Sequence, residues 1–180
     1  AAFLMENFKD KGLKDPADTN HGLDLDAMAL KVANEYSDYK KKQKAVGNLD
    51  YAKLPCVNHP VFKGKDVNYD PREVFVSGLF KEKGINNVFL EFYHSLVQGL
   101  FKAKVSKNVY CVNIDAVIAV ILLKIVWSDY NDGKMEDGDI ESASFATFLF
   151  GRMIGCAAEI DDHTSRGKNM DTRTPASKCS

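Results

Sequence analysis

The stretch NIDAVIAVILLKIVW, residues 113–127, decides the fold class of this chain. It is apolar almost all round, which in a soluble protein indicates a fully buried helix. Its β-branched residues would also fit a buried strand, but its length favours a helix. The longest apolar run, Val117–Trp127, is broken by Lys124 and is too short to span a bilayer. The sequence therefore predicts a central buried helix.

Helical patterns flank this segment on both sides. Further helices are predicted from Leu25 to Gly47-Asn48, from Pro71 to Glu82, from a cap at Asn86 or Asn87 to Phe101, and from a cap at Asp139 to about Ile160. Residues 1–20 and 49–70 carry proline, glycine and asparagine and predict loops. The tail after Gly167 is expected to be irregular. The predicted fold class is all-α.

Size and charge limit the function classes. The 180 residues suffice for one domain with a core, and 45% of them are apolar. The net charge is -1 and the pI is about 6.5, which gives no support for partners that bind through bulk charge. We therefore expect no nucleic acid and no membrane as a partner.

The cysteines favour neither a metal site nor a disulfide scaffold. Cys56, Cys111, Cys156 and Cys179 form no Cys-x-x-Cys pair and no zinc-ligand spacing, so we expect no metal. Cys111 and Cys156 lie in apolar runs and are predicted to be small buried hydrophobic residues. A reducing compartment is the simpler expectation.

Six polar groups lie in order at the predicted element ends. They are His21-Gly22, His59, Asp70-Pro71-Arg72, Asn113-Ile114-Asp115, Gly151-Arg152 and Arg173. Two histidines, one carboxylate and three arginines can together abstract a carbon-bound proton, polarise a carbonyl and clamp a di-acid. This set of groups indicates carbon-acid chemistry.

Each histidine and the carboxylate also has a plainer interpretation. His59, in a rigid loop between prolines, is either a donor to a substrate carbonyl or an exposed loop residue. His21 precedes a helix, where a neutral imidazole can donate to an enolate oxygen or substitute for an N-cap. Asp115 is either the N-cap of an apolar helix or a base whose pKa is raised by desolvation.

The arginines are ambiguous in the same way. Arg72 lies on the first turn of a predicted helix. Arg152 lies among apolar residues and needs a partner, which is either a substrate carboxylate or an internal acid such as Glu159. Arg173 carries no signal by itself.

Taken in order, these motifs resemble the citrate synthase superfamily over most of the chain, from about His21 to Pro175. The matching segments are His21-Gly22-Leu23, Leu54 to His59 followed by Asp70-Pro71-Arg72, Asn113-Ile114-Asp115, Gly151-Arg152, and Arg173 before a proline. The resemblance implies a citrate synthase-like helical fold. Residues 1–48 would belong to the large domain, 49–160 to the small CoA-binding domain, and 161–180 to a tail that returns to the large domain.

The resemblance also implies an activity, the condensation of acetyl-CoA with oxaloacetate to citrate and CoA in the tricarboxylic acid cycle. Asp115 would take the methyl proton, His21 would hydrogen-bond the enolate oxygen, and His59 would polarise the oxaloacetate carbonyl. The implied carboxylate ligands are Arg72, Arg152 and Arg173. The implied CoA contacts are Leu54, Val57, Asn58, Asn113, Lys63 and Lys65. No bound cofactor is implied, since the CoA thioester is a substrate.

Several features depart from the family pattern. Cys56-Val57-Asn58 stands where the family usually has glycines, and Ala116-Val117 follows Asp115 where a Ser-Gly is usual. We expect a C-terminal part of a longer protein, or one of two pieces, in a homodimer or higher assembly in the mitochondrial matrix or cytoplasm. A 2-methylcitrate synthase, the citryl-CoA lyase module of ATP-citrate lyase, and a catalytically silent structural subunit remain alternatives.

Overall fold

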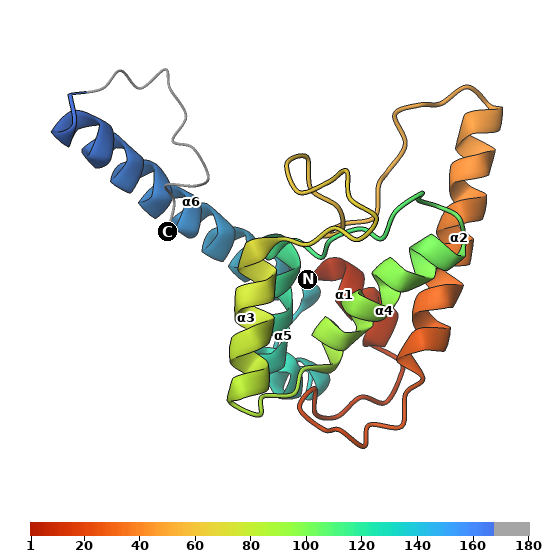
Figure 1. Cartoon of the computed structure of the whole chain (residues 1–180). Helices are drawn as coiled ribbons and strands as arrows, with labels where there is room; N and C mark the ends of the chain where they lie inside the picture. The colour runs from red at the N-terminus through yellow and green to blue at the C-terminus, as the bar shows by residue number, and fades with distance from the viewer. Residues whose placement is uncertain (168–180) are drawn as a thin grey trace. The chain divides into compact units, whose positions relative to one another are not determined.

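The computed structural model describes residues 1–167 and is all-helical over that range (Figure 1). Its helices are α1 (Ala2–Phe8), α2 (Leu25–Ala45), α3 (Pro71–Glu82), α4 (Val88–Lys102), α5 (Ile114–Asn131) and α6 (Asp137–Ser165). Within the described range, β-pairing is limited to two isolated bridges between loop residues. The predicted all-α fold class is confirmed.

Side-chain caps fix where the helices begin. Asp24 accepts a hydrogen bond from Ala27 N–H at the start of α2, and Asp70 does the same for Arg72 N–H at the start of α3. Asn87 caps α4, which resolves the choice that the sequence left open. Each cap satisfies backbone donors that the first helical turn leaves unpaired.

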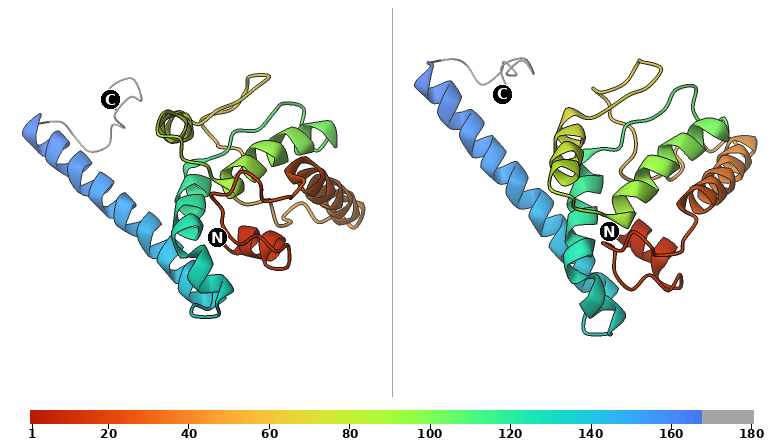
Figure 2. Two further views of the ribbon diagram at one scale, coloured as in Figure 1. Left: turned by 90° about the horizontal axis from the view of Figure 1, so that it is seen from below. Right: turned by 60° about the horizontal axis from the view of Figure 1, so that its bottom comes forward.

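The chain divides into two compact units, Ala1–Ser144 and Phe145–Ser180. In the first unit, α4 lies between α2 and α5 in every view (Figures 1 and 2). Gly99 of α4 faces the backbone of Ala29 on α2, where an added Cβ would lie 3.2 Å from the Ala29 carbonyl oxygen. On the other side, the Phe89 ring packs 4.9 Å from the ring of Trp127 on α5.

Two predictions for the first unit were wrong. Residues 2–8 form a helix rather than a loop, because Leu4, Met5 and Phe8 fill one buried face among polar neighbours. Helix α5 is not buried all round, since Ile125 is exposed. Its buried face packs on the core from Ala116 to Tyr130, and on it the Trp127 indole N–H donates to Leu13 O at 2.7 Å.

Helix α6 begins earlier than expected. Asp139 is its third residue and accepts a hydrogen bond from Glu136 N–H at 2.9 Å, which is the reciprocal half of a capping box rather than the cap itself. In the second unit most of the helix is exposed, Cys156 included, whereas His163 is buried. The burial predicted for Cys156 was therefore wrong, whereas Cys111 is buried as predicted.

Candidate functional site

The loop that carries His59 is tied to the strand-like segment that leads into α5. Val57 pairs with Val112 in an antiparallel bridge. Asn58 N–H donates to Cys111 O at 2.8 Å, and Asn113 N–H donates to Cys56 O at 3.0 Å. These bonds join segments more than fifty residues apart in the chain and hold the histidine loop against the N-terminus of α5.

The backbone of this loop adopts a conformation that glycine favours. Cys56 has a φ of 66° and Asn58 a φ of 67°, both in the left-handed region. Asparagine tolerates this region, but cysteine does so at a cost in strain. The sequence has no glycine at these two positions, but their backbone adopts the left-handed conformation that glycine favours.

His59 is fixed by its own turn and by a neighbouring ring. Val61 N–H donates to His59 Nδ1 at 3.1 Å, and the imidazole stacks on Phe62 with a centroid separation of 4.6 Å. Because Nδ1 is the acceptor, the neutral ring carries its proton on Nε2. That N–H is the donor a substrate carbonyl requires.

Arg72 lies close to His59. Its guanidinium carbon is 5.8 Å from the Phe62 ring that His59 stacks on. Arg72 Nε donates to Asp70 Oδ1 at 2.9 Å and Nη2 donates to Asp70 Oδ2 at 2.7 Å. Asp70 is fully buried while Arg72 is half-exposed. The buried carboxylate thus holds one edge of the guanidinium and leaves Nη1 for another partner.

The pKa shifts connect these groups. Burial opposes the ionisation of Asp70, but hydrogen bonds from Arg72 prevail and lower its pKa, with a smaller electrostatic contribution from His59. The hydrogen bonds to Asp70 raise the pKa of Arg72, and the charge of Asp115 adds to the effect. The Asp70–Arg72 pair therefore lies within electrostatic range of His59 on the Asp70 side and of Asp115 on the Arg72 side.

Asp115 is not the N-cap of α5, and its carboxylate is not desolvated by the fold. The N-cap of α5 is Asn113, whose side-chain oxygen accepts hydrogen bonds from Asp115 N–H at 3.1 Å and Ala116 N–H at 3.2 Å. Asp115 is on the first helical turn and is exposed, so it is not a desolvated carboxylate. The Asn113 amide also donates to Asn58 O at 3.5 Å, which joins the helix start to the loop a second time.

His21 is not brought to this cluster. His21 accepts a hydrogen bond from Leu23 N–H on Nδ1 at 3.0 Å, and it precedes α2, whose N-terminal end lies away from that of α5 (Figures 1 and 2). Arg152 belongs to the second unit, and Arg173 lies outside the described residues. The Arg152 guanidinium stacks over Phe148 at 4.9 Å.

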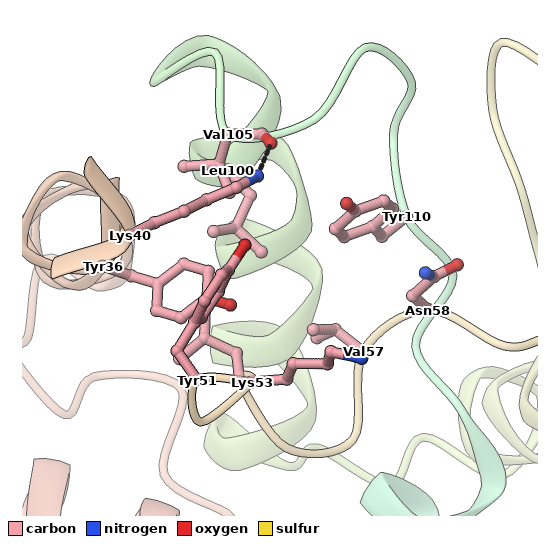
Figure 3. A pocket seen from close by; sticks show the side chains of 10 residues that line it. Tyr36, Lys40, Tyr51, Lys53, Val57, Asn58, Leu100, Val105 and Tyr110 are labelled. Carbon is pink, nitrogen blue, oxygen red and sulfur yellow. Dashed lines mark hydrogen bonds between the residues drawn. The ribbon is translucent and has the colours of Figure 1, made fainter. Parts of the chain in front are cut away.

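A pocket of about 210 Å³ opens beside the loop, between α2 and α4 (Figure 3). Its lining comprises Tyr36, Lys40, Tyr51, Lys53, Leu54, Val57, Asn58, Leu100, Val105 and Tyr110. Three of the predicted CoA contacts, Leu54, Val57 and Asn58, are in this set. The other three, Asn113, Lys63 and Lys65, do not line the pocket. Asn113 contacts Asn58, and Lys65 Nζ lies 5.0 Å from the centre of the Tyr69 ring.

The sequence analysis did not single out the tyrosine and lysine side chains that line the pocket. Tyr36 and Tyr51 lie on one side and Tyr110 on the other, near Asn58 (Figure 3). Burial raises the pKa values of Tyr36 and Tyr110, so both remain neutral phenols at neutral pH. Lys40 Nζ donates to Val105 O at 2.9 Å. These residues come from separate segments, so no local spacing indicates them.

A second group that the sequence analysis missed is centred on Glu73, the residue after Arg72. Glu73 is buried on α3 and contacts His94 Nε2 of α4 at 2.9 Å, and it accepts a hydrogen bond from Ser77. Within residues 1–167, histidine, cysteine and carboxylate side chains do not gather in threes, so this range contains no candidate metal centre.

Comparison with protein-family models, with characterised proteins and with solved structures gives no match for this chain.

Proposed function

We propose that this chain carries the reacting end of a citrate synthase-type site, which condenses acetyl-CoA with oxaloacetate. One observation supports the proposal most strongly. Two backbone hydrogen bonds and the Asn113 amide hold the His59 loop against the N-terminus of α5, where Asp115 is the second helical residue. The His59 and Asn113-Ile114-Asp115 motifs, far apart in sequence, are thus adjacent, and this adjacency supports the proposal.

The proposed chemistry gives one role to each of these groups. The Asp115 carboxylate takes a proton from the acetyl methyl group, and the resulting enolate carbon attacks the keto carbon of oxaloacetate. His59 Nε2–H donates to the keto oxygen and polarises it. The proton taken by Asp115 ends on the new hydroxyl, relayed by His59, so the carboxylate is regenerated. Water then cleaves the thioester, which releases citrate and the CoA thiol.

Arg72 is suited to hold a carboxylate of oxaloacetate. Asp70 occupies the Nε edge of the guanidinium and orients it, and Nη1 is directed elsewhere. The buried Glu73, bonded to His94, anchors the same turn of α3 to α4. A carboxylate that binds Nη1 gains a charge-assisted hydrogen bond from an already ordered donor.

The tyrosine-lined pocket supports a CoA thioester as the second substrate. Its phenol rings offer faces on which an adenine ring can stack, and Lys53 offers a cation for a phosphate. It adjoins Asn58, one residue before His59. The nucleotide end and the reacting end of one thioester would therefore lie on the two sides of the same loop.

The test is release of the CoA thiol from acetyl-CoA and oxaloacetate. Asp115→Asn should abolish it, because the amide cannot accept the proton. Asp26→Asn is the matched control, since Asp26 occupies the same second position of helix α2 and is also exposed. Thiol release that depends on oxaloacetate, is lost in Asp115→Asn and is kept in Asp26→Asn supports condensation.

Two other results would change the proposal. Cleavage of citryl-CoA without condensation would reassign the chain to the lyase reaction. No reaction with acetyl-CoA, propionyl-CoA or citryl-CoA would make it a silent structural subunit. Equal rates for Asp115→Asn and wild type would show that Asp115 is not the base.

A further inference from the structure

Helix α6 presents an unusual apolar face in the second unit. Six large apolar side chains of this helix are between 45% and 66% exposed, namely Phe145, Leu149, Phe150, Met153, Ile154 and Ile160, and Cys156 is exposed with them. Contiguous apolar surface of this kind marks an interaction site rather than a solvated helix. The face runs along residues 145–160, about 24 Å of helix.

The spacing on this face is that of a helix pair. Ala146, Leu149, Met153, Cys156 and Ile160 follow one another at steps of three and four residues. This is the a and d pattern of a heptad repeat, which places apolar residues along one seam. Ile154 is equally apolar but lies on the opposite side of the helix, outside the seam.

Two residues of opposite charge, Arg152 and Glu159, flank the seam and indicate which partner would fit it. Arg152 and Glu159 both occupy the g position, seven residues apart. Two turns of helix separate them by about 10 Å, so they cannot pair within the same helix. Arg152 instead stacks over Phe148, and Glu159 lies 3.8 Å from His163. Of the two alternatives for Arg152, an internal pair with Glu159 is therefore not formed within the helix.

An antiparallel second copy satisfies both charges at once. With Met153 of one copy opposite Cys156 of the other, Leu149 lies opposite Ile160 in the same register. That register also brings Arg152 of each copy next to Glu159 of the other, which gives two ion pairs related by a two-fold axis. A parallel pair offers no such match, because Ala157 and Thr164 would then face these two charges.

We propose that this face of α6 is the contact between two copies of the chain, in an antiparallel helix pair. This proposal does not depend on the proposed catalytic function. It gives Arg152 a protein carboxylate as its partner, in place of the substrate carboxylate that the resemblance implies.

The same helix is long and apolar enough to cross a membrane by length and composition alone. The alternation of Arg152 and Glu159 beside an apolar seam favours a protein partner, since both charges would be costly in hydrocarbon. Membrane insertion is thus an outcome that the test must be able to detect.

The test is sedimentation equilibrium of the full chain, whose mass is 20.0 kDa. The wild type should form a dimer in the micromolar range. Arg152→Glu and Glu159→Arg should each raise the dissociation constant about tenfold or more, because each places like charges together twice. The double variant Arg152→Glu/Glu159→Arg should restore dimerisation, since it exchanges the charges without changing the seam.

Two further variants test the seam and its direction. Ile160→Gln should dissociate the dimer, whereas Ile154→Gln should not, although the two residues are 48% and 56% exposed and the substitution is identical. In the Met153→Cys variant, mild oxidation should link the new thiol to Cys156 of the second copy, which only the antiparallel register brings together.

Three results would overturn the proposal. A wild-type chain that stays monomeric at all concentrations would show that something else covers the face. Failure of the double charge exchange to restore association would exclude the antiparallel register. Binding of the wild-type chain to phosphatidylcholine vesicles, equally in Ile160→Gln and Ile154→Gln, would favour a membrane.

Discussion

Replacing Asn113 with alanine tests how the histidine loop is held. The substitution removes the cap of α5, where the side-chain oxygen accepts two backbone N–H bonds. It also removes the bond from the Asn113 amide to Asn58 O, at 3.5 Å. Losing the cap costs about 1 kcal/mol. The longer bond adds roughly 0.5 kcal/mol, the low end for a hydrogen bond.

The chain contains a suitable control and a suitable probe. Asp24→Ala removes the cap of α2, which makes no recorded contact with the histidine loop, and should cost about 1 kcal/mol. Trp127 is the only tryptophan, is fully buried and lies on α5 itself, so its fluorescence reports unfolding of that helix in urea. With a slope of about 2 kcal/mol/M, the expected midpoint decreases are about 0.7 M for Asn113→Ala and 0.5 M for Asp24→Ala.

Asn113→Asp keeps the capping oxygen but loses the amide donor, so its midpoint should lie between those of wild type and Asn113→Ala. If Asn113→Ala shifts the midpoint no more than Asp24→Ala does, then the bond to Asn58 contributes nothing. The idea that the cap positions the loop would then be refuted.

Three other predictions follow from the site. Arg72 lowers the pKa of Asp70 despite burial, so the ionised Asp70 carboxylate stabilises the fold at neutral pH. This stabilisation is lost as the pH falls through the folded-state pKa of Asp70. The melting temperature of Asp70→Asn should therefore fall less steeply than that of the wild type below about pH 4. Cys56→Gly should change stability by less than about 1 kcal/mol, whereas Cys56→Val should lose about 2 kcal/mol in urea titrations, because valine resists a φ of 66°. Tyr110→Leu should weaken CoA binding by roughly tenfold in titration calorimetry, and Lys53→Gln should weaken it chiefly at low salt; unchanged affinity in both would remove the pocket from the site.

The sequence predicted the helices best where caps and periodicity agree. Pro71 and Glu82 bound α3 as expected, and Asn87 begins α4. Helix α1 was missed because its three buried residues lie in a seven-residue segment among polar neighbours, too short for a periodic pattern. Ile125 and Cys156 show a different limit, since an apolar run does not reveal which of its residues are covered.

The candidate site was predictable in its residue types but not in its arrangement. The motif order drew attention to His59, Arg72 and Asp115, yet nothing in the sequence shows that Asp70 already occupies one edge of Arg72. The left-handed conformation of Cys56 could not be inferred either, because the chain lacks the glycine that would have indicated it. Tertiary pairing between distant loops determines both features.

The most direct test of the proposed chemistry is exchange of the methyl protons of acetyl-CoA with deuterium, followed by NMR in D₂O with an unreactive oxaloacetate analogue present. The account predicts exchange by the wild type and by Asp26→Asn, and no exchange above background by Asp115→Asn. Exchange at the wild-type rate in Asp115→Asn, or none in the wild type, would contradict the central claim that Asp115 is the carbon base.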